Sequence, residues 1–234
     1  MIHAALDTSL GSALVVADGD RVLCNDHLAG TGRESDRELA PWVKATLDGL
    51  NLPLDDVRRW TVGTGPGSFA GLRYGIALVK GFCAISGAAM RGVPSCLALA
   101  HAALAEARGS AQRIGVLHDA RCGQVILVRF ERHADATLQL MGDALVLTPE
   151  ELLAEQHRCD HYVSAQTAAL PALPELVATR LLSCASIDAG ALLHAPERLW
   201  PWPQNPQEIM ASCEPLYVRP PVFVKPQPVK IPQI

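Results

Sequence analysis

The chain has 234 residues, a formal net charge of −4, 49% hydrophobic residues and 19% charged residues. This length allows one large domain or two small lobes that share a cleft. The weak negative charge excludes the global basic field of a protein that binds nucleic acid on its own. The seven cysteines are scattered, odd in number and without a CxxC pair, which is typical of a reduced compartment rather than of a disulfide framework or a zinc site.

The start of the chain and its longest apolar stretch both indicate a cytoplasmic protein. Residues 1–7 lack the basic region of a signal peptide and run straight into a strand-like segment. The apolar stretch 74–90 is interrupted by Lys80 and is rich in glycine, so it is a poor candidate for a membrane span. We therefore expect a soluble chain that makes no contact with a membrane.

The first half of the chain alternates apolar runs with turn signals and longer helical patterns. Asp-Gly at residues 18–19 lies between two short apolar runs, which is a hairpin signal. Glycine near position 49 marks the end of a first helix. The elements predicted here are strands at 3–6, 13–16, 21–27 and 60–62, helices at about 33–49, 69–86 and 96–106, and a short strand ending near 94.

The resulting order, βββαβαβα, implies right-handed parallel crossovers beside an antiparallel meander. This order predicts an α/β protein with a two-lobed actin-like ATPase or ribonuclease-H-like fold and a mixed sheet in the N-terminal lobe. We expect that lobe to span residues 1–108 and to recruit a helix from about 186–199. A smaller second lobe, 109–234, follows a hinge at Gly109-Ser110 and carries a proline-rich tail.

The second lobe gives fewer signals. Apolar runs at 114–117 and 124–130 predict a second hairpin. Thr148, followed by proline and two acids, is a helix start. The proline-rich run 200–206 cannot continue a helix, so we expect a surface connection there.

A carboxylate and two hydroxyls follow the first predicted strand at Asp7, Thr8 and Ser9. At a strand–turn junction they could hold a metal-bound phosphate or orient a water molecule. The alternative is a turn in which these side chains bind their own backbone.

Residues 63–73 (GTGPGSFAGLR) place four glycines and a proline between a strand and a helix. The backbone can therefore come very close to whatever faces it, and the N–H groups at the helix start favour an anion. The candidate anion-binding residues here are Gly65, Gly67 and Ser68. A tight turn that only permits close packing explains the glycines equally well. The stretch matches neither a P-loop nor G-x-G-x-x-G.

The helix predicted at 69–86 is apolar on nearly every side. Leu72, Ile76, Val79 and Cys83 form one stripe, and a second stripe lies well round the helix at Tyr74, Leu78, Phe82 and Ile85. Such a helix must be buried on more than one side. One stripe can cover the sheet, and the other then needs the second lobe or another protein. Small residues at Ala77, Gly81 and Ala84 would let another helix approach closely.

His157 and His161 have the i, i+4 spacing of zinc ligands on a helix. No glutamate follows the first histidine, and Tyr162-Val163 favours a strand instead of a helix. We therefore expect no metal at this pair. No G-x-S-x-G nucleophile elbow is present in the sequence.

Four segments, in chain order, resemble the TsaB family. Residues 5–9 (ALDTS) and 63–73 are similar to its first strand and to its motif G-x-G-P-G-S-F-T-G-[LV]-R. Residues 119–125 (DARCGQV) resemble D-A-R-[RK]-x-E-V, and residues 214–219 (EPLYVR) resemble P-x-Y-[LV]-R. The glycine motif is specific, and the other segments gain weight because they appear in the same order.

The resemblance implies an actin-like fold and a heterodimer with TsaD, the subunit that transfers a threonylcarbamoyl group to the adenosine beside the tRNA anticodon (t6A modification). It implies that the ATPase TsaE joins the complex, that tRNA is contacted only indirectly, and that the chain forms a homodimer when alone. The chain itself would be non-catalytic, pairing through helices of the N-terminal lobe. The interface residues expected on this basis are Leu39, Trp42, Arg73, Tyr74, Ala77, Leu78, Gly81, Phe82 and Ile85.

The chain departs from the family pattern at three positions. Ala70 replaces the usual threonine, while Cys122 and Gln124 replace a basic and an acidic residue. These changes weaken the expectation of nucleotide turnover but leave the partner role intact, because the glycines and apolar stripes are retained.

One alternative hypothesis is an ATP-binding or ATP-hydrolysing actin-like enzyme, with Asp7 as a metal or water ligand and residues 65–68 holding phosphate. The other is a metallopeptidase that uses His157 and His161. No cofactor is required by the partner role, although ATP or ADP within the complex fits the first alternative.

Overall fold

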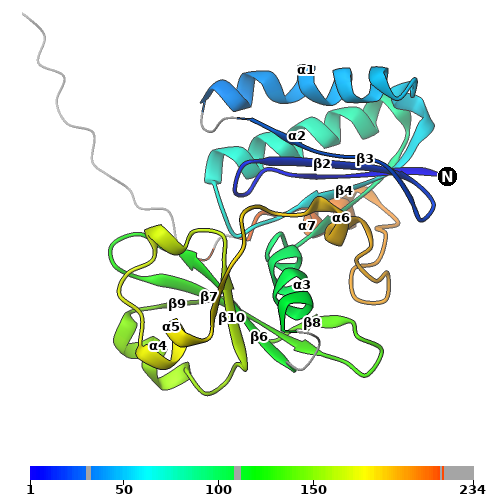
Figure 1. Ribbon diagram of the computed structural model, residues 1–234. Helices are drawn as coiled ribbons and strands as arrows, with labels where there is room; N and C mark the ends of the chain where they lie inside the picture. The colour runs from blue at the N-terminus through cyan, green and yellow to red at the C-terminus, as the bar shows by residue number, and fades with distance from the viewer. Residues whose placement is uncertain (30–32, 108–111, 217, 219–234) are drawn as a thin grey trace, which may run out of the picture.

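The computed structural model describes residues 1–29, 33–107, 112–216 and 218, with the side chains of 33–36 excluded. It contains two lobes, each built on a mixed β-sheet (Figure 1). The expected hinge at Gly109-Ser110, the proline-rich tail, and Tyr217 and Arg219 of the C-terminal motif lie outside the described residues.

The first sheet has the strand order β3-β2-β1-β4-β5. Its first three strands are antiparallel neighbours, and β4 and β5 continue the sheet in parallel with β1. Helices α1 and α2 cover one face of this sheet (Figure 1). Its elements are β1 (Ile2–Asp7), β2 (Ser12–Asp18), β3 (Arg21–Leu28), α1 (Arg33–Gly49), η1 (Leu54–Asp56), β4 (Val57–Gly63), α2 (Phe69–Ser86) and β5 (Ala89–Val93).

The second sheet has the order β11-β10-β6-β7-β8, with β9 also paired to β7. Read in the opposite direction, the second sheet has the same arrangement as the first. Strands β8, β7 and β6 are antiparallel neighbours, and β10 and β11 continue the sheet in parallel with β6. The predicted ribonuclease-H-like, actin-like fold class is therefore confirmed, with the topology present twice. The elements are β6 (Arg113–Asp119), β7 (Val125–Arg132), β8 (Leu138–Leu140), β9 (Leu145–Leu147), α4 (Pro149–Glu155), β10 (His161–Ser164), η2 (Thr167–Ala169), α5 (Glu175–Thr179) and β11 (Leu181–Ser183).

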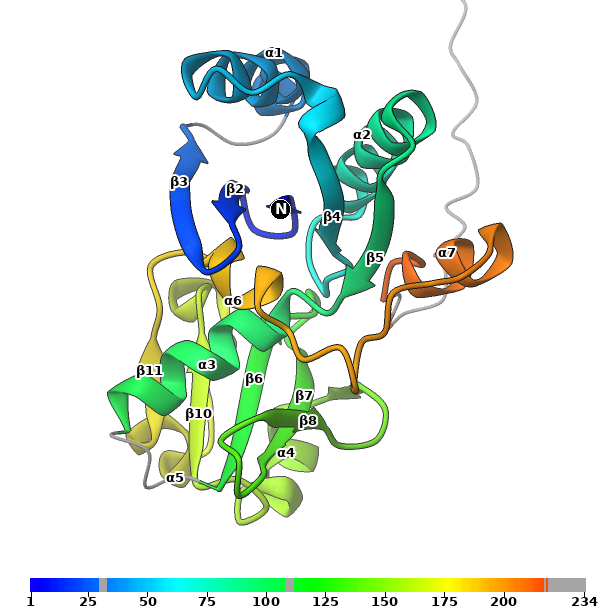
Figure 2. The ribbon, with the colours of Figure 1, turned by 90° about the vertical axis from the view of Figure 1, so that its right-hand side faces the viewer.

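Two helices cross from one lobe to the other. Helix α3 (Cys96–Glu106) follows the first sheet in sequence but packs against β6 and β10 of the second. Helix α6 (Ala189–Leu193) follows the second sheet and packs against β1, β2 and β4 of the first. Figure 2 shows both helices between the two sheets. One hydrophobic cluster consequently runs through both lobes, from Val15 through Leu97 and Leu192 to Phe130.

Helix ends follow the local signals in the sequence. The Ser68 hydroxyl accepts a hydrogen bond from the Gly71 N–H at the start of α2, and Gly87 ends that helix at φ +70. Thr148 and Glu151 form a reciprocal capping box at α4. Both helices begin where the sequence predicts.

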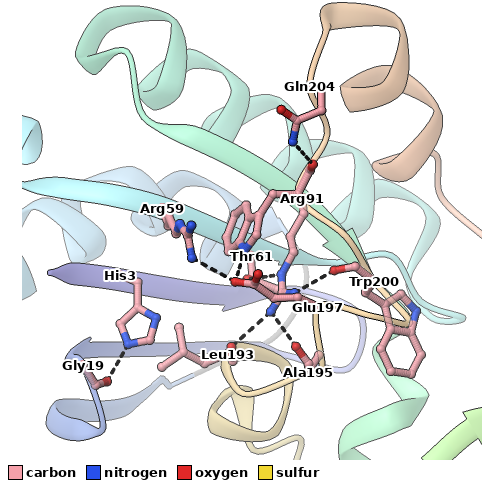
Figure 3. Close-up of polar contacts among 11 residues, drawn as sticks. His3, Gly19, Arg59, Thr61, Arg91, Leu193, Ala195, Glu197, Trp200 and Gln204 are labelled. Atoms are coloured by element: carbon pink, nitrogen blue, oxygen red, sulfur yellow. Dashed lines mark hydrogen bonds and ion pairs between the residues drawn. The ribbon is translucent and has the colours of Figure 1, made fainter.

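A buried arginine holds the segment that returns from α6 to the last helix, α7 (Pro206–Ser212). Arg91 is 2% exposed. Its guanidinium donates to the carbonyls of Leu193, Ala195 and Trp200 at 2.7–3.2 Å, and also to the Thr61 hydroxyl (Figure 3). It also lies 4.5 Å from the centre of the Trp202 ring, which contacts Arg59 as well. The run 200–206 is a connection with no fully buried residue, as predicted, and Arg91 holds it in place through the Trp200 carbonyl and the Trp202 ring.

We predict that Arg91→Ala lowers the free energy of unfolding by about 3 kcal/mol, because it leaves buried carbonyl groups without a hydrogen-bond donor and creates a cavity. Arg91→Lys should recover only part of this loss, since an ammonium cannot reproduce the planar fork. Urea denaturation measures both. The control is Arg59→Ala, whose pair with the exposed Glu197 should be worth about 1 kcal/mol or less. Equal losses for the Arg91 and Arg59 alanine variants would contradict the assigned role.

Candidate functional site

The acidic turn after β1 and the glycine-rich loop after β4 lie side by side. Strands β1 and β4 are parallel neighbours, so their carboxyl ends meet at the same edge of the sheet. The backbone carbonyl of Ser9 accepts a 2.7 Å hydrogen bond from the Ser68 N–H. The Thr8 hydroxyl donates to the Gly71 carbonyl at 2.8 Å. The structure therefore brings the two candidate motifs into direct contact.

Atoms of the protein itself fill the space that the glycines leave. A Cβ on Gly67 would stand 2.4 Å from the Ser9 carbonyl oxygen, and one on Gly71 would stand 2.4 Å from the Thr8 carbonyl oxygen. At Gly75, one turn further along α2, it would stand 2.3 Å from the Thr8 hydroxyl. Close packing of the loop and helix against the first turn thus accounts for these glycines without a ligand.

Gly65 has a different reason to be glycine. Its φ of +96 is unfavourable for other residues, and a Cβ there would meet Leu72 at 2.8 Å. Its N–H donates to the Ser95 hydroxyl at 2.9 Å. Gly65 is therefore turned into the protein, whereas Gly67 and Ser68 line the space between the lobes.

Asp7 points inward and is 1% exposed. Its Oδ1 accepts hydrogen bonds from the Ser9 N–H at 2.9 Å and the Ser9 hydroxyl at 2.6 Å. Its Oδ2 faces Gly63, where a Cβ would lie only 1.8 Å away. Burial raises the pKa of Asp7, and hydrogen bonds from Ser9 and Ser95 oppose that shift. This carboxylate is packed in the interior, so it is not presented as a metal or water ligand.

We predict opposite effects of alanine at two glycines of α2. Gly75→Ala should lower the free energy of unfolding by about 2 kcal/mol, because its Cβ collides with Thr8. Gly81→Ala meets nothing within 4 Å and should raise stability by about 0.5–1 kcal/mol through helix propensity. Thermal or urea unfolding compares the two variants. A stabilising Gly75→Ala would show that the turn does not pack tightly on α2.

We predict that Asp7→Asn changes how stability depends on pH. The native carboxyl binds its proton more tightly than its ordinary pKa of 3.8 implies, so its contribution to stability falls as the pH rises above about 4. An amide has no such proton and keeps an oxygen for Ser9. The variant should therefore gain stability relative to wild type between pH 4 and pH 8 in denaturant titrations. Parallel pH curves for the two proteins would rule this out.

Part of α2 is exposed although it is apolar. Its buried side holds Leu72, Ile76 and Val79, as the wheel predicts. Along the opposite side runs what we call the α2 face. It consists of exposed residues: Ala70, Arg73, Tyr74, Ala77, Gly81, Ala84 and Ile85. Ile85 is 79% exposed and Tyr74 is 36% exposed.

Four of the expected interface residues lie elsewhere. Leu39 is 1% exposed and belongs to the core beneath α1, so it is wrong as a contact for a partner. Leu78 and Phe82 are half-buried in the same cluster, and the Phe82 ring lies 5.4 Å from that of Trp60. The second apolar stripe of α2 is thus partly covered by its own lobe, and only part of it is left for contact with another protein. Trp42 is half-buried and donates to Asp26 at 3.2 Å.

Helix α7 extends the α2 face. A groove of about 470 Å³ separates the two helices, with Ala77 and Lys80 on one side and Met210 and Pro215 on the other. Met210 is 67% exposed. Helix α7 is not among the elements predicted above, although the sequence carries a start signal for it: Asn205 caps the helix, and proline and glutamate follow in its first turn.

The structure separates the paired histidines from any helix. His157 is exposed beyond the end of α4, and His161 opens β10. The i, i+4 spacing therefore does not bring the two rings onto one helical face. Among the described residues, no group of three or more His, Cys, Asp or Glu side chains is placed to hold a metal ion.

The sequence matches a family model described as TsaD: tRNA N6-adenosine threonylcarbamoyltransferase, over residues 30–195. The chain belongs to this family. It is a homologue of the tRNA threonylcarbamoyladenosine biosynthesis protein TsaB of Escherichia coli K12, with 29% identity over 146 residues. The match spans 62% of this chain and 62% of that relative's length.

Solved structures of similar proteins share the fold. An uncharacterized Pseudomonas aeruginosa protein with similarity to peptidase YEAZ has a TM-score of 0.70 at 23% identity, covering 93% of this chain and 99% of that one. YeaZ from Pseudomonas aeruginosa has a TM-score of 0.63 at 24% identity, covering 82% and 88% respectively. These likenesses support the two-lobed fold over nearly the whole chain.

Helix α2 is also long and apolar enough, by length and composition, to cross a membrane. Core helices of soluble proteins meet the same criterion, and α2 packs one side on the first sheet. The length and composition of α2 are thus weak evidence for a membrane span.

Proposed function

We propose that this chain is the partner subunit that binds TsaD and supports threonylcarbamoyl transfer to the tRNA adenosine next to the anticodon, without catalysing the transfer itself. The observation that carries the proposal is the α2 face, an exposed and largely apolar helix surface continued by the groove beside α7. Exposed apolar patches of this kind mark protein–protein contacts. The TsaB relative, named for threonylcarbamoyladenosine biosynthesis, supplies the pathway.

The shape of the α2 face suits another helix. Ala77, Gly81 and Ala84 have short side chains that let a second backbone come close, while Tyr74 and Ile85 flank them as larger anchors. Arg73 lies over the Phe69 ring, 3.8 Å from its centre, at the N-terminal end of the face. Helix-to-helix packing with TsaD in this region accounts for an apolar surface that would otherwise face water.

The rest of the proposed assembly is supported by the similarity to the TsaB relative. TsaE would join the TsaD-bound form, tRNA would be contacted chiefly through the partners, and two copies of this chain would pair through the α2 face when TsaD is absent. The chain's own charge of −4 agrees with an indirect contact to tRNA. A cytoplasmic location fits these partners.

Size-exclusion chromatography with light scattering, on this chain alone and mixed with TsaD from the same organism, tests the proposal. We expect a homodimer alone and a stable mixed species with TsaD. The mixed species should also raise threonylcarbamoyl transfer to tRNA above the level of TsaD alone. Two separate peaks, even with ATP and tRNA present, would refute the partner role.

We predict that Ile85→Glu weakens TsaD binding by about 2–4 kcal/mol, because it places a charge at an apolar anchor that the contact would bury. The side chain is 79% exposed in the isolated chain, so the fold should be unaffected. Titration calorimetry measures the loss. Val22→Glu is the matched control, since this residue is 50% exposed in β3 at the opposite edge of the sheet. Equal affinities of the two variants would place the interface elsewhere.

A further inference from the structure

A pocket of about 310 Å³ lies on the first lobe, on the face of the sheet that packs against α6. His3 of β1, Arg59 of β4 and Arg91 of β5 line it, together with the segment that follows α6 and the Trp202 side chain. The strand register places the three side chains on one face, because His3 pairs with Arg59 and the partner of Arg91 is two residues further along β4. Helices α1 and α2 cover the opposite face, so the pocket is separate from the α2 face.

Arg91 brings a buried positive charge to this pocket. The side chain is 2% exposed, and its four hydrogen bonds to described residues all go to neutral oxygens, three carbonyls and one hydroxyl (Figure 3). Burial lowers the pKa of Arg91 to about 10, so the guanidinium still carries its charge at pH 7. A buried charge with no counterion in contact is unfavourable, and an anion close to it reduces this cost.

A single carboxylate, that of Glu197, serves two guanidinium groups at the pocket. Its Oε1 accepts from Arg59 Nη1 at 2.9 Å and from Trp202 Nε1 at 2.8 Å. Figure 3 shows this carboxylate beside both arginines. Glu197 is the one acidic residue among the described residues that line the pocket. Two guanidinium charges against one carboxylate leave a net positive charge.

The other ionisable groups at the sheet end of the pocket are already engaged. His3 Nε2 donates to the Gly19 carbonyl at 2.7 Å. The ammonium of Met1 pairs with Asp18 at 2.6 Å, and this pair is about half exposed. These contacts add no net charge to the pocket, so its positive charge comes from the two arginines.

Several N–H donors at the pocket have no acceptor among the described residues. A guanidinium has five N–H groups. Arg59 uses one of them for Glu197, and Arg91 makes four hydrogen bonds. The exposed ring of His194 makes no hydrogen bond within the described part of the chain and adds a further polar group. Because these groups come from β4, β5 and the segment after α6, they suit an anion with several oxygen atoms better than a planar carboxylate.

We propose that this pocket binds the phosphate group of a small molecule, with phosphate oxygens hydrogen-bonded to Arg59 and placed in the field of the buried Arg91. Guanidinium groups match the geometry of phosphate oxygens. The volume of about 310 Å³ admits a phosphate with a small organic group. The Glu197 carboxylate competes with the ligand for Arg59 and therefore limits the affinity. The site does not depend on contact with TsaD.

The test is NMR of the full chain labelled with ¹⁵N at the tryptophan indoles, titrated with glycerol 3-phosphate and with inorganic phosphate at constant ionic strength. The Trp202 indole N–H donates to Glu197 at the pocket, and Trp202→Phe assigns its signal. Acetate and uncharged glycerol are the comparisons. We expect at least one phosphate to shift this signal saturably with a Kd below about 5 mM, and acetate to bind about tenfold more weakly or less. The same phosphate should raise the melting temperature by about 3–5 °C at ten times its Kd. A response to inorganic phosphate alone identifies the free ion as the ligand.

Arg59→Gln should weaken phosphate binding about tenfold or more, with little change in stability because its ion pair is exposed. Arg58→Gln is the matched control, since it removes the same charge from the next residue of β4, which is exposed on the opposite face. Glu197→Gln should bind phosphate several-fold more tightly, because the competing carboxylate is gone. The proposal is overturned if neither phosphate shifts the Trp202 signal saturably, or if acetate binds as tightly as phosphate. Equal affinities of the two arginine variants, or no gain in Glu197→Gln, would also overturn it.

Discussion

The contact between the turn after β1 and the backbone of α2 is the constraint on which the rest of the first lobe depends. Atoms of Thr8 and Ser9 occupy the positions that a Cβ at Gly67, Gly71 or Gly75 would need. Because these three positions are glycine, α2 packs directly on the end of the sheet. This packing buries one side of α2 in the core and aligns its N-terminus with the space between the lobes. It also leaves the opposite side of the helix in solvent, where the α2 face forms.

The same contact bears on the role of the acidic turn at Asp7. In an actin-like protein, a carboxylate and hydroxyls beside a glycine-rich loop suggest a phosphate site. Here Asp7 bonds to its own turn and is enclosed by Gly63 and Ser95, so its role is to organise the loop. The geometry of the turn therefore gives this buried carboxylate a structural part in the first lobe.

Local patterns in the sequence were sufficient for the first lobe. Strand alternation, the Asp-Gly turn and the cap at Ser68 place β1 to β5 and α2 within a few residues, because each signal acts over one or two turns of chain. The sequence did not predict which sheet α3 and α6 pack against, because packing on a distant sheet leaves no local pattern in the sequence. Exposure also escaped prediction: Leu39 and Ile85 are both apolar on helices, yet only the three-dimensional arrangement shows that one is buried and the other is not.

The exchange of α3 and α6 between the sheets bears on how this chain acquires its structure. The second sheet is covered by a helix that is synthesised before it, and the first sheet is covered by a helix that is synthesised after nearly all of the second. If the chain were cut between the two sheets, neither half would carry the helix that covers the inner face of its own sheet. The N-terminal strands therefore have to wait for residues near 190 before their inner face is closed, and we expect the two lobes to fold as a single cooperative unit.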